Sequence, residues 1–185
     1  IDAMGGDNAP AEIVKGAVEA VNEHKEVKIF LVGRQESIQK ELAKYTFDTD
    51  RIEIVHASQV IDNNEHPVAA IRSKKDSSIV VAQKMVREGR ADAVISAGST
   101  GAILVGGQLV VGRIKGVERA PLAAMIPTTK GASLLIDCGA NVDARASHLL
   151  QFAKMGSIYM ENVVGKKNPT VALVNIGLEE EKGNQ

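Results

Sequence analysis

A glycine-rich loop with hydroxyl side chains lies near the middle of the chain, over residues 96–102. It follows an apolar run that is typical of a buried parallel strand, and it precedes an apolar helical stretch. The first turn of a helix leaves backbone N–H groups unpaired, and the helix dipole favours negative charge there. Ser99 and Thr100 add hydroxyl donors, while Gly98 and Gly101 allow close approach to the backbone. The loop therefore predicts a phosphate site, or an ordinary turn with a Ser or Thr cap. It matches neither the P-loop nor the G-x-G-x-x-G pattern.

Three more polar loops follow predicted strands, at residues 2–8, 137–143 and 175–182. In a parallel sheet all four loops lie at the carboxyl edge, where ligands bind in open α/β folds. The loops carry four aspartates that could form an acidic cluster: Asp2, Asp7, Asp137 and Asp143. Such a cluster suits a divalent cation, general acid–base chemistry or hydrogen bonds to a hydroxylated ligand. Alternatively, Asp7 and Asp143 cap helices and Asp2 orients a neighbouring loop.

Other reactive side chains give weaker signals. Three basic residues precede a predicted helix that Asp76 is expected to cap: Arg72, Lys74 and Lys75. These basic residues either hold phosphate or belong to a solvated loop. His148 comes early in a long predicted helix and is expected at its surface. Cys138 follows a strand, but a small buried thiol is the commoner role, and no activating base adjoins it.

Strands alternate with helices along the chain, which predicts an α/β fold with a mostly parallel sheet. Expected strands cover residues 27–32, 51–55, 92–95, 122–126, 133–136 and 170–176. A first helix is expected to begin near Pro10 after a cap at Asp7 or Asn8, and further helices cover residues 34–45, 67–72, 77–90, 103–114 and 146–164. The short join at 127–131 favours an antiparallel pair. We expect a single α/β domain over residues 1–185, in which the irregular segment 56–75 could rim a cleft.

Composition indicates a globular protein with an aliphatic core. The chain has 185 residues, of which 44% are hydrophobic and 3% aromatic, and a formal net charge of −1. These values give no indication of a nucleic-acid surface. The single cysteine excludes an internal disulfide and fits a reducing cytosol. The longest apolar stretch is too short for a membrane span. Both ends read as interrupted elements, so we expect the chain to be part of a larger protein.

Seven sequence blocks together resemble the PlsX family, the bacterial acyl-carrier-protein:phosphate acyltransferases of phospholipid synthesis. In family order, the blocks cover residues 2–10, 74–78, 96–102, 112–116, 137–143, 148–153 and 175–183. The resemblance is to the N-terminal part of the family's length. Ser99 stands where Asn is usual, and Cys138 stands where a small apolar residue is usual, which argues further against a cysteine nucleophile.

The resemblance implies a three-layer α/β/α fold related to phosphotransacetylase and to isocitrate and isopropylmalate dehydrogenases. It implies a cytoplasmic homodimer, in peripheral contact with the membrane, that needs no NAD, metal or other cofactor. The implied reaction converts an acyl-carrier-protein thioester and inorganic phosphate into acyl phosphate and free carrier protein. A membrane glycerol-3-phosphate acyltransferase would then use the acyl phosphate.

Expected roles for individual residues combine the resemblance with the chemistry of the loops. Phosphate is expected to meet Lys74, Lys75, Ser77, Gly98, Ser99, Thr100 and Gly101. Backbone N–H groups that could stabilise the thioester oxyanion belong to Gly5, Gly6, Gly139 and Ala140. Alongside Thr100, the catalytic residues that would order these loops or the pantetheine arm are Asp2, Asp137, Asn141 and Asp143. An acidic carrier protein is expected to dock on Arg113, Lys115 and Arg119.

Two other functions are compatible with this sequence. A metal- and NAD-dependent decarboxylating dehydrogenase on the same fold would use the aspartates for a divalent metal, but the missing G-x-G-x-x-G disfavours it. A half-domain that binds phosphate or an acyl ligand without activity is the other alternative. Loss of activity in chelator would identify the first, and comparison with a longer chain would identify the second.

Overall fold

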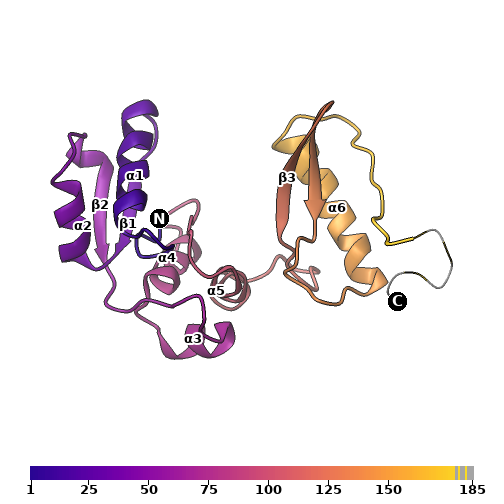
Figure 1. Cartoon of the computed structure of the whole chain (residues 1–185), viewed down its shortest axis with the longest axis horizontal. Helices are drawn as coiled ribbons and strands as arrows, with labels where there is room; N and C mark the ends of the chain where they lie inside the picture. The colour runs from indigo at the N-terminus through magenta and orange to yellow at the C-terminus, as the bar shows by residue number, and fades with distance from the viewer. Residues whose placement is uncertain (178, 180–181, 183–185) are drawn as a thin grey trace. The chain divides into compact units, whose positions relative to one another are not determined.

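A computed structural model describes residues 1–177, 179 and 182 (Figure 1). The chain divides into two compact units, Ile1–Gly112 and Arg113–Gln185, and each is described by itself. The predicted loop over 175–182 and the block over 175–183 extend onto residues outside this description, at positions 178, 180, 181 and 183. The expectation of one domain over residues 1–185 stays a prediction.

The first unit is built around a parallel strand pair. β1 (Ile29–Gly33) pairs with β2 (Ile52–His56), with Ile29 opposite Ile52. Asp2 adds a single parallel bridge to Val32 at the other edge of β1. These strands form because their residues are mostly apolar or β-branched, which favours an extended backbone. Successive side chains of a strand point to opposite faces, so both faces of the pair can be packed against helices.

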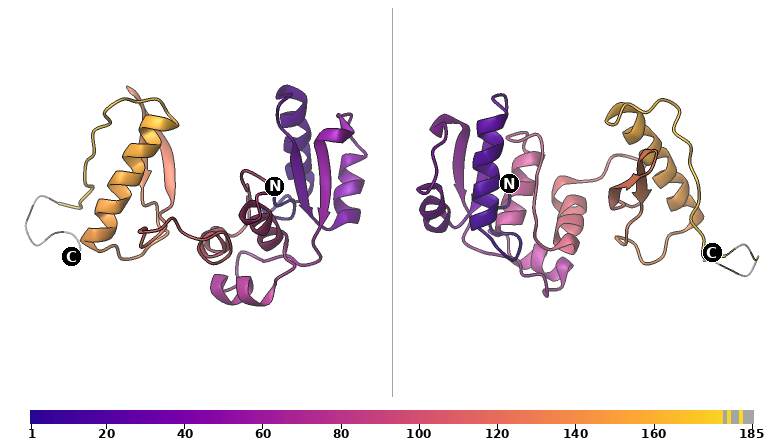
Figure 2. Two further views of the ribbon diagram at one scale, coloured as in Figure 1. Left: turned by 180° about the vertical axis from the view of Figure 1, so that it is seen from behind. Right: turned by 45° about the horizontal axis from the view of Figure 1, so that its top comes forward.

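Helices cover both faces of this strand pair. Leu31 of β1 packs into a core cluster with α1 (Ala11–Glu23) and α2 (Gln35–Leu42). The next residue, Val32, points the other way and packs with Ala82 and Met85 of α4 (Ser78–Arg87). Figure 2 shows α1 alongside the strands in both views. The prediction of an α/β fold with parallel pairing is confirmed, and the layers of this unit fit a three-layer α/β/α arrangement.

The other elements of the first unit pack beside α4. Ile71, Ile79 and Ala102 belong to one apolar cluster, which joins α4 to the helices on either side of it. Those helices are α3 (Pro67–Ser73) and α5 (Thr100–Gly106), and a π-helical turn, η2 (Gly107–Val111), continues α5. Elsewhere in the unit, a 3-10 turn, η1 (Thr49–Arg51), precedes β2.

The second unit is a hairpin with a helix packed on it. β3 (Ala123–Thr128) and β4 (Gly131–Ile136) are antiparallel, as predicted, and Thr128 stands opposite Gly131 across a two-residue turn. α6 (Ala146–Asn162) packs against β4 at Gly156, where an added Cβ would lie 3.5 Å from side-chain atoms of Leu134 and Ile136.

Two predicted strands are wrong. Residues 92–95 and 170–176 form no strand in the part of the chain that the structure describes. Near the first, the Asp2 N–H donates to the Ile95 carbonyl at 2.9 Å, yet the Ile95 side chain is 63% exposed. An apolar run becomes a strand only when neighbouring backbone satisfies its N–H and C=O groups, and composition does not reveal that neighbour.

The helices themselves are where periodicity placed them, and Ser99 caps α5, as one of the two interpretations of the glycine-rich loop predicted. The caps predicted for three other helices are wrong. α1 follows Pro10 without a side-chain cap, so neither Asp7 nor Asn8 serves. Asp76 does not cap α4, because its Oδ2 accepts hydrogen bonds from the Ser58 N–H and Oγ at 2.9 and 2.5 Å. α6 has Arg145 at its N-cap, which leaves Asp143 outside the helix.

Candidate functional site

Asp2 joins the first polar loop to the glycine-rich loop of residues 96–102. Its carboxylate is 3% exposed; Oδ1 accepts from the Met4 N–H at 3.1 Å, and Oδ2 accepts from Ser96 Oγ at 2.6 Å. Ser96 Oγ in turn accepts from the Gly98 N–H at 3.0 Å. This chain of bonds brings together two of the four loops that were expected at one sheet edge. Asp2 therefore orients a neighbouring loop, which is one of the roles predicted for it.

The glycines of these loops make room for other parts of the protein. A Cβ on Gly5 would lie 2.6 Å from Asp2 Oδ2 and 2.8 Å from the Gly98 nitrogen. A Cβ on Gly101 would lie 2.5 Å from Cγ of Pro67, the first residue of α3. Close packing between loops therefore accounts for Gly5 and Gly101, whereas the sequence alone suggested access for a ligand at Gly101.

Two hydroxyl side chains lie at the start of α5, of which one is hydrogen-bonded and the other is exposed. Ser99 is buried, and its Oγ caps the helix by accepting from the Ala102 N–H at 3.3 Å. Thr100 is exposed, and within the described residues its hydroxyl makes no hydrogen bond. The Gly98 N–H is engaged by Ser96 and the Ala102 N–H by Ser99, so an anion here would meet the Thr100 hydroxyl and the N–H groups between those two positions.

The predicted basic group is largely tied into the protein. Lys74 Nζ donates to Glu65 Oε1 at 2.6 Å and to the Val60 carbonyl at 2.7 Å, and the Lys74 hydrogen bond lowers the pKa of Glu65. Lys75 Nζ donates to the Ile71 carbonyl at 3.3 Å. Ser77 is fully buried, and its Oγ has no partner in the described structure. Lys74 and Lys75 thus hold the segment between Val60 and Lys75 together, whereas the Ser77 hydroxyl takes no part in this.

In the second unit, Asp137 organises the loop that follows β4. Its Oδ1 accepts from the Leu122 N–H at 2.6 Å and the Ala140 N–H at 3.3 Å, and its Oδ2 accepts from Asn141 N at 2.7 Å and Nδ2 at 3.1 Å. Partial burial disfavours the charged carboxylate, but these hydrogen bonds outweigh that cost and lower the pKa of Asp137. The Ala140 N–H, which was predicted to stabilise an oxyanion, is thus already engaged by Asp137. Gly139 has a φ of +92°, a left-handed backbone conformation that favours glycine. Cys138 Sγ donates to the Leu135 carbonyl at 3.1 Å.

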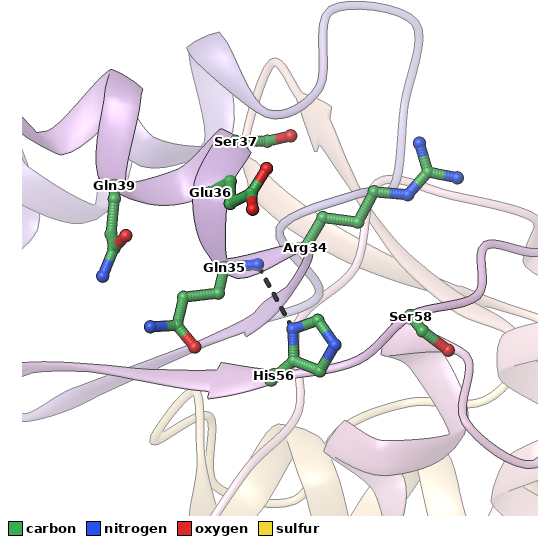
Figure 3. A pocket seen from close by; sticks show the side chains of 7 residues that line it. All are labelled: Arg34, Gln35, Glu36, Ser37, Gln39, His56 and Ser58. Carbon is green, nitrogen blue, oxygen red and sulfur yellow. Dashed lines mark hydrogen bonds between the residues drawn. The ribbon is translucent and has the colours of Figure 1, made fainter.

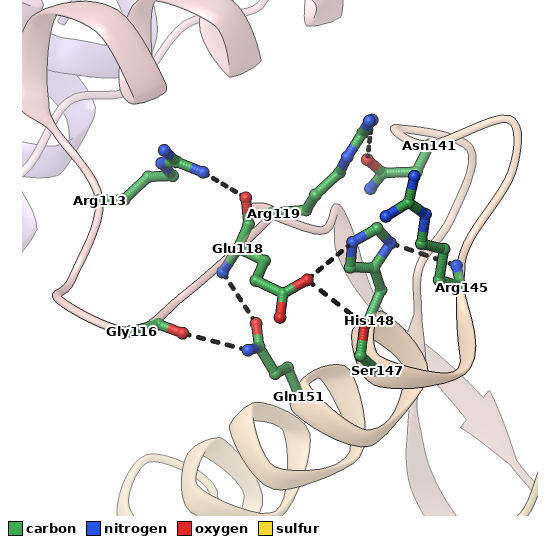
Figure 4. A network of polar contacts seen from close by, with 9 residues as sticks. All are labelled: Arg113, Gly116, Glu118, Arg119, Asn141, Arg145, Ser147, His148 and Gln151. Carbon is green, nitrogen blue, oxygen red and sulfur yellow. Dashed lines mark hydrogen bonds and ion pairs between the residues drawn. The ribbon is translucent and has the colours of Figure 1, made fainter.

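A polar network fixes the basic loop of residues 113–119 on the first turns of α6 (Figure 4). Gln151 holds the loop backbone, accepting from Glu118 N at 2.9 Å and donating to the Gly116 carbonyl at 3.1 Å. Glu118 Oε2 lies 3.1 Å from His148 Nε2 and accepts from Ser147 Oγ at 3.3 Å. Since the Arg145 N–H donates to His148 Nδ1 at 3.2 Å, a neutral His148 carries its proton on Nε2, toward Glu118.

The three cations predicted for docking lie on or next to this network. Arg113 donates to the Glu118 carbonyl, and Arg119 Nη1 lies 3.5 Å from Asn141 Oδ1. Lys115 is exposed at the tip of the loop. His148 is buried, so its prediction as a surface residue is wrong, and sequence reasoning missed Glu118 and Gln151 altogether. For Gln151 the one signal was the 148–153 block, which placed it in a single motif with His148, whereas Glu118 lies outside all seven blocks.

A cleft in the first unit opens where β1 and β2 end (Figure 3). Its volume is about 630 Å³, and its lining comes from Arg34, Gln35, Glu36, Ser37, Gln39, His56 and Ser58. The Gln35 N–H donates to His56 Nδ1 at 3.4 Å. Ser58 is fixed by Asp76, whose pKa is lowered by the Ser58 side-chain and backbone hydrogen bonds. The segment that begins at His56 thus contributes to a cleft, as expected.

No group of three or more His, Cys, Asp or Glu side chains that could hold a metal ion occurs among residues 1–177, 179 and 182. The oxygens of Asp2 and Asp137 instead accept the N–H and O–H donors described above. Over the same residues, no helix combines the length and apolar character needed to cross a membrane.

These features define an α/β protein whose polar loops are held in place by buried or hydrogen-bonded aspartates. The chain belongs to the fatty acid synthesis protein family, whose model matches residues 1–185. It is 54% identical to a phosphate acyltransferase of Clostridium acetobutylicum, 54% to one of Clostridioides difficile and 55% to one of Alkaliphilus oremlandii, each time over the whole chain. It covers 56%, 54% and 55% of these proteins, so it spans about half the length of the curated relatives it matches. The family resemblance seen in the sequence is confirmed.

Proposed function

We propose that this chain forms part of an enzyme that transfers a fatty acyl group from an acyl-carrier-protein thioester to inorganic phosphate. The observation that carries the proposal is the similarity over the whole chain to proteins named phosphate acyltransferase. Membership of the fatty acid synthesis protein family supports the acyl substrate. The product is an acyl phosphate, which serves phospholipid synthesis.

Phosphate is proposed to bind at the start of α5. The exposed Thr100 hydroxyl and the N–H groups of the first helical turn suit an anion, and Ser99 fixes that turn by capping it. Asp2 and Ser96 hold the preceding loop rigidly, so a bound phosphate would meet donors that are already oriented. Phosphate is anionic at neutral pH, and the site therefore needs to aim it more than to deprotonate it.

The acyl transfer step needs donors for the thioester oxyanion and order in the loops around it. A phosphate oxygen attacks the thioester carbonyl carbon, the C–S bond then breaks, and the carrier thiolate leaves. We propose either the N–H groups of Gly5 and Gly6 or the N–H group of Gly139 as the oxyanion donors. Asp137 and Asn141 order the loop that carries Gly139, as their mutual hydrogen bonds indicate.

The remaining partners are proposed from the chemistry of the product and from the family resemblance. Acyl phosphate is a reactive mixed anhydride, so an acyltransferase at the membrane, using glycerol 3-phosphate, is the expected consumer. We also propose a homodimer in the cytoplasm with peripheral contact to the membrane.

Thr100→Val tests the phosphate site, because it keeps the shape of the side chain and removes the hydroxyl. A hydrogen bond to a charged group is worth about 1.5–3 kcal/mol, so the apparent constant for phosphate should rise by about tenfold or more. Thr100→Ser should restore most of the affinity, and Thr129→Val, an exposed threonine in the hairpin turn, should change nothing. Unchanged phosphate kinetics in Thr100→Val would remove Thr100 from the site.

A further inference from the structure

We infer that Ile114, between Arg113 and Lys115, is the apolar anchor of a docking surface for an acidic protein partner. The inference rests on the proposed function in one respect, since that function names the partner as the acyl carrier. It adds the contact residue, the device that presents it and the kind of surface it fits.

Ile114 is 80% exposed, whereas Val117, the other apolar side chain of the loop, is half-buried. A cation stands on each side of it in the sequence, and Arg119 follows at the other end of the loop. The one carboxylate of residues 113–119, Glu118, is directed to Ser147 and His148. The loop therefore offers solvent an isoleucine with a cation on each side of it in the sequence, while its one carboxylate is held by residues of α6.

The backbone of the loop is fixed before any partner arrives. The Val117 N–H donates to the Ile114 carbonyl at 3.0 Å, which closes a β-turn with Gly116 at its third position. Gly116 has a φ of +93°, the left-handed value that a type II turn requires there. Because Ile114 is the first residue of this turn, its position is set by the turn and by the bond from Gln151 to the Gly116 carbonyl.

This rigidity matters because binding costs entropy whenever a loop must be ordered. Figure 4 shows Gln151 reaching Gly116 and Glu118, and Glu118 reaching His148 and Ser147. Four side-chain contacts thus attach a short loop to the first turns of α6. A surface residue with no role in recognition needs no such attachment, whereas a preformed anchor gains affinity from it.

An acidic protein fits this surface better than an anionic membrane does. The described loop exposes a single large apolar side chain, which suits a small apolar pocket among carboxylates on a folded partner. Membrane association through an interface usually requires a whole apolar helix face or a lipid chain. Complementary charge speeds the encounter, and the buried isoleucine slows dissociation.

The test uses the full-length protein and measures binding without catalysis. Ile114→Ser and Lys115→Glu are titrated against fluorescent acyl-carrier protein, beside two controls from the same unit. Ile158→Ser changes an isoleucine on α6 that is 59% exposed, and Lys130→Glu changes a cation in the hairpin turn. Ile114→Ser should weaken binding by about tenfold or more, since buried anchors dominate interfaces. Lys115→Glu should weaken it most at low salt, and both controls should bind as the unchanged protein does.

Acyl phosphate formation is then measured with the carrier thioester and with the same acyl group on a small thiol. Ile114→Ser should raise the apparent constant for the carrier thioester alone. If the enzyme makes acyl phosphate and Ile114→Ser binds carrier normally, the docking inference is wrong and the proposed function stands. If the enzyme makes no acyl phosphate but Ile114→Ser still loses carrier binding, the proposed function is wrong and the docking surface stands. Loss of binding to anionic vesicles, with carrier binding unchanged, would assign the loop to a membrane and overturn the inference.

Discussion

Gly106 and Gln83 make a contact whose energetics can be worked out in advance. Gln83 of α4 is 1% exposed, and its Nε2 donates to the Ile103 carbonyl of α5 at 3.0 Å. Its Oε1 has no hydrogen-bond partner in the described structure. A Cβ on Gly106 would lie 1.9 Å from that oxygen and 2.7 Å from Cδ. The amide therefore lies directly over the Gly106 Cα, where α5 ends.

Gly106→Ala should destabilise the protein even though alanine is the better helix former. Non-bonded heavy atoms settle about 3.5 Å apart, so the amide would have to move by about 1.5 Å. Moving it costs the bond to Ile103, worth about 1 kcal/mol, and overpacking a filled core costs about 1–3 kcal/mol. Alanine returns about 1 kcal/mol of helix propensity. The net loss in the free energy of unfolding should be about 2 kcal/mol.

The effect of Gly106→Ala on the free energy of unfolding should change sign once the Gln83 side chain is shortened. In a Gln83→Ala background the clash disappears, and Gly106→Ala should then stabilise by up to about 1 kcal/mol. The coupling energy from the double-mutant cycle should be about 3 kcal/mol, at the upper end for residues in contact. Gly107→Ala is the matched control, because Gly107 is the next helical residue and has nothing within 4 Å of its Cβ position.

Denaturant unfolding of the four proteins in the cycle and of Gly107→Ala measures these values. Since α5 begins at Thr100, the apparent constant for phosphate should rise in Gly106→Ala and return toward normal in the double variant. If Gly106→Ala stabilises the unchanged background as much as Gly107→Ala does, the assigned position of the Gln83 amide is wrong.

Two further predictions concern the loop-ordering aspartates. Gly5→Ala should lower the free energy of unfolding by about 1–3 kcal/mol, because its Cβ would meet Asp2 Oδ2 and the Gly98 nitrogen within 2.8 Å, while Gly16→Ala on α1 meets nothing and should not destabilise. Equal stability of these two variants would contradict the close packing of the loops. Asp137 has a lowered pKa when folded, so it stabilises the protein above its usual pKa near 3.8 and loses that contribution as pH falls through the lower, folded value. The stability difference between the unchanged protein and Asp137→Asn should therefore shrink as the pH falls through the usual pKa toward the lower, folded value, and a constant difference would show that the carboxylate charge is not what matters.

Local patterns predicted a large part of this fold. Helical periodicity located all six α-helices of the described residues to within a few positions, and a short polar join predicted the β3–β4 hairpin. Residues 2–8 meet residues 96–102 as the expected topology of parallel strands predicted, although the run at 92–95 is held by a hydrogen bond from the Asp2 N–H to the Ile95 carbonyl and forms no strand. These features depend on residues close in sequence, or on one general rule of sheet geometry.

The structural features that were not predicted from the sequence depend on contacts between residues that are distant along the chain. The run at 92–95 looks like a strand whether or not a neighbour pairs with it. His148 reads as a surface residue until Glu118, thirty positions earlier, is placed beside its ring. Gly101 reads as an opening for a ligand until the ring of Pro67 occupies that space. In each case the residue type fits two environments, and only the tertiary contact decides between them.

The candidate residues separate into two groups once their contacts are known. Asp2, Lys74 and Asp137 have their oxygens or ammonium group engaged by neighbouring protein atoms, so their work is to hold loops in shape. Thr100, at the start of α5, and Lys115, on the loop that Gln151 and Glu118 hold, are exposed to solvent. A group that must release its own partners to bind substrate loses those hydrogen bonds and leaves the partners unpaired, whereas an exposed group on an ordered loop does not. Substitution of the exposed residues should therefore alter substrate constants at unchanged stability, and substitution of the engaged ones should alter stability first.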